Sequence, residues 1–559
     1  MERTHPKNRL LTEWRQMGLV ALVSSLCAAW PLWAQIDRPY EPIVVAGDSL
    51  LASAGLPVPD VRLWAYQAQE GRWQVIPFQI DEVNPQVRPW DRYFVVEDSL
   101  LGILDLDDEL VLMARDLGER ADSTQWPATG DSLRFELAFL DSLDGTAGYA
   151  YLYWQEPPQD VPNPYGLAYD SLQDRVTSAN YQLGFNATGQ LADVVISRDV
   201  GGSGVDLFDR FKVRAIGSFL IFPIYMDEEL IRAERWYASV GPVRIIRNLN
   251  GRFKGKIAFL DVDEPFTQTV FFYPYSGSFE LTALPLDKAK DLGVTVSAVR
   301  ASWDMNPNAS GMRFYSAHNM AGVPVDGVKD QIDPSCRPGQ LNWTLVTGAA
   351  GTMVNLFFVP QLGDRIGLYY YDATDGKTAD GQTLSKDTGD MLSYGDNGFL
   401  LSGNIQNYFA PGATFSVVYR NYFLPPNVTP EQAARLCEQA AHPLRVSVSL
   451  QRRPAAPSAV VASANGAPVA FALAAHPNPL HATTMLSFKL ARRSRVVLEV
   501  YDVAGRSVAR LVDEELPAGL HHRPWDGCDA SGRQVPSGLY FARLASDEAR
   551  HVTKLLLVR

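Results

Sequence analysis

Short runs in which apolar and polar residues alternate recur along most of the chain, and turn-forming residues separate them. Examples are VRLWAYQ at 61–67, LRFELAFL at 133–140 and RIGLYYYD at 365–372, all rich in β-branched and aromatic residues. Alternation with a period of two places the apolar side chains on one face of a strand, and closely spaced turns favour antiparallel pairing. The 42 glycines and 37 prolines suit a chain with many tight connections. The sequence therefore predicts an all-β protein made of several β-sandwiches.

One or two short helices are expected among these strands. Thr429 is suited to be a helix N-cap, Pro430 the first helical residue and Gln432 the capping-box partner at the start of TPEQAARLCEQAAH. Residues 226–240 form a second candidate helix. Neither segment changes the all-β class.

The length of the chain calls for several domains, because 559 residues exceed what one hydrophobic core usually holds. We expect an N-terminal β domain over 35–175 and a larger, supersandwich-like β domain over 176–450. Residues 451–470 are rich in Pro, Ala and Ser without periodicity, which is typical of a linker. A last domain follows over 471–559.

The first 34 residues have the features of a secretory signal peptide. Four basic residues flank the start of a mostly apolar stretch over 17–33, and Ala34 offers a small residue for cleavage. The alternative is a membrane anchor, but the apolar run contains Pro31 and is at the short limit for spanning a bilayer. We therefore expect a protein that is secreted or attached to the outer surface, with no transmembrane segment after signal cleavage.

The charge balance argues against nucleic acid as a partner. The chain has 50 Lys and Arg against 63 Asp and Glu, a formal net charge of −13. Proteins bind phosphate backbones through Lys and Arg, and an acidic surface repels them. Nucleic-acid binding is excluded on this ground.

Three cysteines lie outside the predicted signal, namely Cys336, Cys437 and Cys528. Export permits a disulfide, and Cys336 with Cys437 is the favoured pair because both precede the linker. Cys528 is then a spare thiol. The spacing of the three fits neither a disulfide framework nor a zinc site.

Histidine placement limits the catalytic chemistry available. Of eight histidines, only His318 and His442 lie between the signal and the linker. A Ser-His-Asp or Cys-His arrangement would have to use one of these two. His442 ends the expected helix, where a cation favours the helix dipole, so it is interpreted as a cap. The catalytic residues are therefore unknown from the sequence.

A dense acidic cluster is the candidate metal site. Asp105, Asp107, Asp108 and Glu109 occur in LDLDDEL, immediately before an expected strand. Carboxylates at alternate positions can bind Ca²⁺ in exported β domains. The alternative is a solvated acidic turn without a metal, so calcium is the one cofactor considered.

Aromatic and acidic residues in the second domain form a candidate ligand site. Aromatic rings beside carboxylates are suited to binding sugars, whereas in β-sandwiches aromatic residues are more often part of the core. Polar–aromatic loops that would line a sugar-binding cleft follow Trp303 and surround Tyr394. The candidate ligand-binding residues are Trp303, Asp304, Tyr315, His318, Tyr394 and Asp396.

A dense set of landmarks marks the last domain, including a PNP motif, YDVAGR, WDG and SGLY. The landmark residues are Pro477, Asn478, Pro479, Tyr501, Asp502, Gly505, Trp525, Asp526, Gly527, Gly538 and Tyr540. The segment 474–559 resembles the type IX secretion sorting domain of Bacteroidota, an immunoglobulin-like fold akin to the C-terminal domain of flagellar hook-capping proteins. The resemblance implies that the outer-membrane type IX translocon is a partner. The alternative is a purely structural Ig-like module.

A fainter resemblance concerns the second domain, in which GPVR at 241–244 leads into an expected strand. With its long antiparallel strands and aromatic loops, this domain resembles galactose-mutarotase-like supersandwich proteins. That resemblance would imply sugar chemistry. A lyase of that kind needs a base, for which Arg244, Arg247, Tyr315 and His318 are candidates.

Three hypotheses for the body of the protein follow. The first is the binding of carbohydrate, such as a polysaccharide, or of another extracellular ligand. The second is a carbohydrate-active enzyme, either a polysaccharide lyase or a glycoside hydrolase. The third is a structural surface protein or adhesin. The sequence does not decide whether the body is catalytic.

Overall fold

The computed structural model describes most of the chain after the predicted signal. The described residues are 36–53, 56–84, 93, 103–104, 107–127, 133–154, 160–257, 260–282, 293–359, 365–375, 388–408, 416–454, 473–476, 484–490, 492–502, 506–517, 519–530, 533–546 and 550–557. The signal peptide expected over 1–34 lies outside them. The chain divides into two compact units, Met1–Pro454 and Ala455–Arg559, and each is described by itself.

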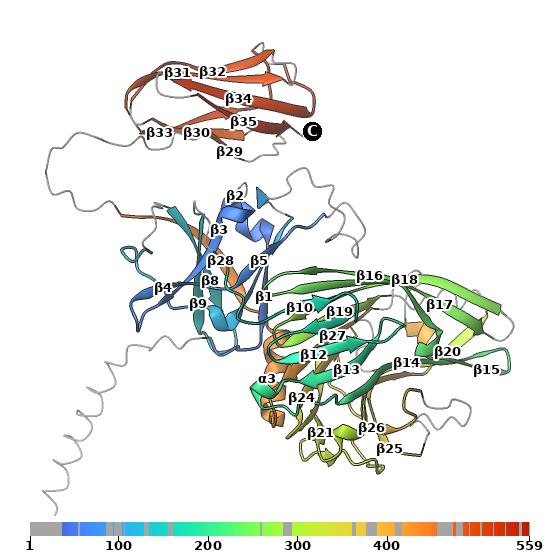
Figure 1. Cartoon of the computed structure of the whole chain (residues 1–559). Coiled ribbons are helices and arrows are strands. Elements are labelled where there is room, and N and C mark those ends of the chain that lie inside the picture. The colour runs from blue at the N-terminus through green and yellow to red at the C-terminus, as the bar shows by residue number, and fades with distance from the viewer. Residues whose placement is uncertain are drawn as a thin grey trace, which may run out of the picture. The chain divides into compact units, whose positions relative to one another are not determined.

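The all-β prediction is confirmed, since antiparallel strands form nearly all the regular structure (Figure 1). In the N-terminal part, one five-stranded sheet has the order β28-β8-β9-β3-β4, and a three-stranded sheet has the order β1-β7-β5. The strands are β1 (Pro42–Ala46), β3 (Val61–Gln67), β4 (Arg72–Val75), β5 (Phe78–Asp81), β7 (Glu109–Met113), β8 (Leu133–Leu140), β9 (Ala147–Trp154) and β28 (Arg445–Arg452). A short pair, β2 (Leu56–Pro57) with β6 (Ile103–Leu104), lies beside them in sequence.

Strand β28 comes from the far end of the first unit. It pairs along its whole length with β8, from Arg445 opposite Leu140 to Arg452 opposite Leu133. We expected residues 176–450 to form one domain, but the end of that range belongs to the N-terminal sheet. The chain therefore returns to its first sheet before the linker, which ties the two ends of this unit together.

The larger part of the first unit contains three sheets around one core. Their strand orders are β10-β11-β12-β13, β15-β14-β20-β26-β25 and β16-β17-β18-β19-β27-β24-β23-β21-β22. The four-stranded sheet contains β10 (Ala168–Asp170), β11 (Arg175–Thr177), β12 (Tyr181–Phe185) and β13 (Leu191–Ile196). The five-stranded sheet contains β14 (Phe208–Phe219), β15 (Phe222–Met226), β20 (Val294–Met305), β25 (Ile366–Ala373) and β26 (Ser393–Ser402). The nine-stranded sheet contains β16 (Ile231–Val240), β17 (Ile245–Ile257), β18 (Leu260–Tyr273), β19 (Ser276–Thr282), β21 (Arg313–Ser316), β22 (Val323–Pro324), β23 (Asn342–Gly348), β24 (Gly351–Phe358) and β27 (Ser416–Leu424).

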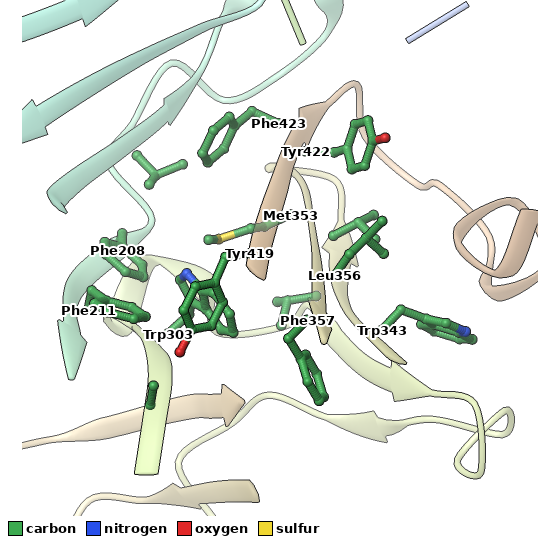
Figure 2. Close-up of a cluster of buried hydrophobic side chains, with 14 of the residues drawn as sticks. Phe208, Phe211, Trp303, Trp343, Met353, Leu356, Phe357, Tyr419, Tyr422 and Phe423 are labelled. Atoms are coloured by element: carbon green, nitrogen blue, oxygen red, sulfur yellow. The ribbon is translucent and has the colours of Figure 1, made fainter. Parts of the chain in front are cut away.

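Aromatic side chains from facing strands fill this core (Figure 2). Trp303 of β20 packs between Phe211 of β14 and Tyr419 of β27, with ring centroids 5.4 and 5.3 Å away. Phe399 of β26 lies 5.8 Å from the same Tyr419 ring. Within a strand, every second side chain faces this core, as Val299, Ala301, Trp303 and Met305 of β20 do. The alternation seen in the sequence is what directs these side chains inward.

A chain of buried amide groups crosses the same core. Asn421 of β27 donates to Asn355 of β24, which donates in turn to Asn397 of β26 at 3.1 Å. Asn397 also donates to the backbone carbonyl of Trp303. The chain links the nine-stranded sheet to the five-stranded sheet through satisfied polar groups, which fixes the register between them.

The helix expected at residue 430 is confirmed as α3 (Pro430–Ala441). Thr429 and Gln432 form the complete capping box, with each side chain bonded to the other residue's backbone. The second expected helix, over 226–240, is wrong. Asp227 caps only one 3₁₀ turn, η5 (Glu228–Leu230), and β16 then pairs with β17 from Ile231 onward. Pairing with a long neighbouring strand outweighs the helical propensity of this Glu- and Arg-rich segment.

The second unit is a two-sheet sandwich, as expected of an Ig-like domain. One sheet has the order β29-β30-β33 and the other β32-β31-β34-β35. The strands are β29 (Leu473–His476), β30 (Thr484–Leu490), β31 (Ser494–Asp502), β32 (Ser507–Leu516), β33 (Gly519–Trp525), β34 (Gly538–Ser546) and β35 (Arg550–Leu557). Its core is separate from those of the first unit.

Candidate functional site

A row of basic side chains on β14 forms the centre of the most unusual polar site in the described chain. Arg210, Lys212 and Arg214 occupy alternate positions and so share one face of the strand, while Phe211 points to the core. The neighbouring strand β20 places Asp304, Ser302 and Arg300 opposite them in register. The face of this sheet that points away from Phe211 and the core therefore has charged side chains, most of which are buried.

Ion pairs neutralise this face, and three of them are buried. Lys212 Nζ lies 2.5 Å from Asp304 Oδ2, and neither side chain is exposed. The other two pairs are Arg214 with Glu228 of η5, at 3.5 Å, and Arg300 with Asp396 of β26, at 3.9 Å. Buried charged groups are tolerated only when they are paired. Each residue of a pair therefore restricts where its partner can lie.

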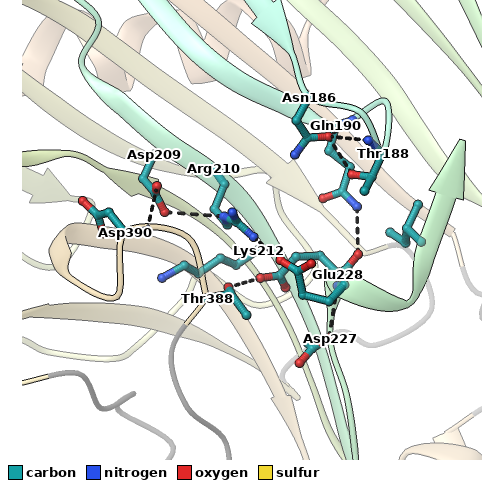
Figure 3. A network of polar contacts seen from close by, with 12 residues as sticks. Asn186, Thr188, Gln190, Asp209, Arg210, Lys212, Asp227, Glu228, Thr388 and Asp390 are labelled. Carbon is teal, nitrogen blue, oxygen red and sulfur yellow. Dashed lines mark hydrogen bonds and ion pairs between the residues drawn. The ribbon is translucent and has the colours of Figure 1, made fainter. Parts of the chain in front are cut away.

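Arg210 and Asp209, at the edge of this charged face, are partly exposed. They belong to the network of polar contacts that Figure 3 shows. Asp209 accepts a hydrogen bond from the backbone of Asp390 at 3.1 Å, and Arg210 Nε lies 3.6 Å from its other oxygen. Burial, with the nearby charge of Asp390, raises the pKa of Asp209 to about 6. A carboxyl group with that pKa can hold or release a proton near neutral pH.

Glycine is required beside this carboxylate. Gly389 has a φ of +76°, and a Cβ at that position would collide with the Asp209 side chain. Thr388, next to it, accepts a hydrogen bond from Arg214 and donates one to Glu228. The segment around Thr388 and Gly389 is thus fitted closely to the charged face.

Four of the six candidate ligand residues lie on the neighbouring strands β20 and β26. Asp304 accepts a hydrogen bond from the backbone of Tyr394 at 3.3 Å, which joins the two strands. Trp303, Asp304 and Asp396 are buried, whereas Tyr394 is half-buried. The Trp303 ring packs in the core and is not available to stack on a sugar at the surface.

The other two candidates, Tyr315 and His318, lie on and just after β21 in the nine-stranded sheet. His318 is exposed, and Tyr315 is half-buried beneath Arg313. Hydrogen bonds from Ser335 lower the pKa of Asp333, and His318 contributes a smaller effect of the same sign. The six residues therefore do not form one cleft.

Arg244 and Arg247, the two arginines that were candidates for a lyase base, both form ion pairs. Arg244 contacts Asp81 and Glu109, and the attraction of these carboxylates outweighs burial and raises its pKa. Arg247 Nε donates to Asp174 at 2.8 Å. Neither guanidinium can accept a proton, so neither is suited to act as a base.

The acidic cluster expected to bind calcium is described only in part. Asp105 lies outside the described residues, Asp107 is exposed and Asp108 is buried. Glu109 accepts hydrogen bonds from Tyr93 and from Arg244. Among the residues that the structure describes, no group of three or more potential ligands could hold a metal ion.

The expected disulfide between Cys336 and Cys437 is not present, since both thiols are free. The sulfur of Cys437 instead accepts a hydrogen bond from Arg337 at 3.1 Å and donates to the carbonyl of Leu341. Burial raises the pKa of both thiols to about 12. They are protonated at neutral pH and so are poor nucleophiles.

An apolar pocket opens into the core beside Arg247. It encloses about 520 Å³ of space free of protein atoms, its open mouth included. Polar groups at its wall come from Arg247 and three amides. The lining is Leu183, Phe185, Gly189, Gln190, Leu191, Phe211, Arg247, Gln268, Val270, Phe272, Gly277, Trp303, Asn421 and Phe423. The pocket is built from alternate residues of several strands, a pattern that the sequence shows only as ordinary core.

The landmarks of the last domain have structural roles inside the second unit. Trp525 is buried, its indole N–H donates to the carbonyl of Cys528, and its ring packs edge-on against Tyr540. Tyr540 donates to the carbonyl of Pro536, and Asp502 accepts from the backbone of Arg506. Pro477, Asn478, Pro479 and Gly505 lie outside the described residues.

Two further findings relate the chain to known classes of protein. None of the helices in the described part of the chain has the length and hydrophobicity of a membrane-spanning segment. Residues 480–549 match the family described as the FlgD Ig-like domain, so the C-terminal domain is Ig-like. No curated protein has a matching sequence.

Three solved structures share a distant likeness with this chain. One is an alpha-mannosidase from Enterococcus faecalis V583, at 12% identity and a TM-score of 0.37, covering 84% of this chain and 51% of that one. Dimeric latent PorU from Porphyromonas gingivalis has 12% identity and a TM-score of 0.15, with coverages of 82% and 36%. PorZ of the same organism, a surface component of the type-IX secretion system, has 10% identity and a TM-score of 0.13, with coverages of 74% and 48%. The chain thus spans about half or less of each.

Proposed function

We propose that this chain is exported and that its C-terminal Ig-like unit is the address read by a type IX translocon. The observation that carries the proposal is the match of residues 480–549 to the FlgD Ig-like domain, together with the sorting-domain landmarks around it. The signal-like first 34 residues supply the preceding step, passage across the inner membrane.

The autonomy of the second unit supports this role. It has its own core around Trp525, and residues 451–470 before it have the composition of a linker. An address that folds by itself can be recognised, and removed, without disturbing the body of the protein.

Deletion of the address tests the proposal in the native cell. A chain ending at residue 454 keeps every strand of the first unit, including β28, and so keeps its fold. We expect the truncated chain to accumulate in the periplasm, while the full chain reaches the cell surface or the medium. Equal surface delivery of both chains would refute the proposal.

For the body, we propose binding of an extracellular ligand, with carbohydrate as the first class to test. The partly open edge at Asp209 and Arg210 offers polar groups of the kind that sugars require. The half-buried Tyr394, whose backbone donates to Asp304, offers an aromatic ring. The enzyme alternative rests on Asp209, whose pKa of about 6 suits a general acid.

A polysaccharide panel with the full chain separates these two hypotheses. The binding proposal predicts retention on at least one glycan, which Asp209→Asn and Tyr394→Ala weaken, without release of product. Product release that disappears in Asp209→Asn would establish the enzyme instead. The absence of binding and of product on every glycan would contradict both and favour a structural surface protein.

A further inference from the structure

Three consecutive large apolar side chains are exposed at the tip of the hairpin formed by β14 and β15. Leu220, Ile221 and Phe222 are 78%, 87% and 58% exposed. Isolated exposed apolar residues are ordinary on protein surfaces, but a run of three on one projecting turn is not. Figure 1 shows this hairpin at one extremity of the larger part of the first unit.

The backbone of this turn argues for a retained function. Leu220 and Ile221 are the two residues between the paired Phe219 and Phe222. Leu220 has a φ of +55°, a conformation that favours glycine or asparagine over a branched side chain. The turn therefore combines an unfavourable backbone conformation with unfavourable exposure, and a Gly-Ser turn would relieve both.

The hairpin is also free of charge well beyond its tip. No charged residue occurs over 215–226, and the adjoining part of β20, 294–299, has none either. These segments lie side by side, from Ala215 opposite Val299 to Phe219 opposite Val294. The first charges of the hairpin, Arg214 and Asp227, are at its base, and Arg214 pairs with Glu228, the residue after Asp227.

We propose that this apolar hairpin inserts into the interfacial region of a lipid bilayer. The tip is exposed at the end of a hairpin and is uncharged, so it suits insertion among lipids better than docking into a complementary protein groove. Three side chains are far too small an area for a stable protein interface, which needs roughly 800 Å² from each partner. A bilayer requires no matching surface.

The mode of attraction follows from the charges. The tip contains no cation and the chain has a net charge of −13, so insertion is driven by burial of apolar surface and not by headgroup charge. Binding should therefore be stronger on neutral lipid than on anionic lipid, and it should not weaken as salt is raised. Insertion of one apolar hairpin gives reversible attachment to the bilayer and not permanent anchoring.

Co-sedimentation of the full chain with phosphatidylcholine vesicles tests the proposal. The test variant is the double change Leu220→Gly with Ile221→Ser, which removes the apolar tip and supplies residues favoured in this turn. The matched control is Leu172→Ser, because Leu172 is 97% exposed on a different turn. Phe222→Ser provides a second tip variant, and thermal unfolding establishes that all variants fold.

The expected result is binding of the wild-type chain and of Leu172→Ser, at least ten-fold weaker partitioning of the double variant, and intermediate partitioning of Phe222→Ser. Addition of anionic lipid should reduce wild-type binding. No vesicle binding by the wild-type chain, or equal binding by the double variant, would overturn the proposal. The proposal would also be overturned if sedimentation velocity showed that the wild-type chain is a dimer and the double variant a monomer. The tip would then hold two copies of the chain together.

Discussion

Lys212 and Asp304 form an ion pair at 2.5 Å, and both side chains are fully buried. They lie on the face of the five-stranded sheet that is opposite to Trp303. Asp304 also accepts a hydrogen bond from the backbone of Tyr394, so the pair connects β14, β20 and β26. Two charges removed from water lose hydration that their mutual attraction only partly restores. Their main effect is therefore to make each residue depend on the other.

Removing one partner of this pair should be costly. Lys212→Met leaves the Asp304 carboxylate buried without its cation, and we expect the free energy of unfolding to fall by about 3–5 kcal/mol. The double variant Lys212→Met with Asp304→Leu should lose much less, because no charge is then buried. Urea denaturation measures both, and a single variant as stable as the wild type would contradict this account.

The pH dependence of stability should contain a contribution from Asp116. Tyr165 donates a hydrogen bond to its carboxylate at 2.5 Å, but burial dominates and raises the pKa of Asp116 from 3.8 to about 6. The folded chain therefore holds this proton more tightly than the unfolded chain, so the contribution favours folding below pH 4. It is lost as the pH rises from 4 to 6, by at most about 3 kcal/mol.

Asp116→Asn isolates this contribution, since the amide oxygen still accepts from Tyr165. We expect the variant to gain stability over the wild type as the pH is raised from 4 to 7, measured by urea denaturation at each pH. Comparing the two chains removes the effect of other raised acids, such as Asp206 and Asp209. A stability difference that does not change with pH would contradict the assigned cause.

Arg244 should control the junction between the N-terminal sheets and the larger part. Its guanidinium reaches Asp81 of β5 and Glu109 of β7 from the segment before β17. Arg244→Met leaves both carboxylates without their buried cation, and we expect faster limited proteolysis at this junction and a loss of about 3–5 kcal/mol.

The control for this variant is Arg72→Met, which removes an exposed ion pair with Glu70. Exposed pairs contribute about 1 kcal/mol or less, so this variant should be digested at the wild-type rate. Equal protection of the Arg244 variant and the wild type would show that the junction is held by other contacts.

Local signals in the sequence predicted what local interactions decide. The capping box of Thr429 and Gln432 depends on neighbours three residues apart, and α3 begins where it was expected. Alternation predicted the strands for the same reason. The segment 226–240 misled because its composition favours a helix, whereas its actual structure depends on β17, a separate strand.

The candidate sites were harder to predict, because partners come from distant positions. Arg244 and Asp81 are 163 residues apart, and nothing in the sequence indicates that they meet. The alternating Arg210, Lys212 and Arg214 are visible in the sequence, but such a pattern usually indicates a solvent-exposed face. Trp303 was nominated for a cleft because it precedes polar residues, whereas its strand position directs it into the core.

Surface exposure of a reporter that carries the address would show whether the C-terminal unit is sufficient for sorting. A passenger protein carrying residues 1–34 at its N-terminus and 455–559 at its C-terminus would be expressed in a bacterium with a type IX system and in a matched strain without the translocon. We predict surface exposure of the reporter in the first strain and periplasmic retention in the second. A reporter that stays in the periplasm of both strains would contradict the assignment of the C-terminal Ig-like unit as a sorting address.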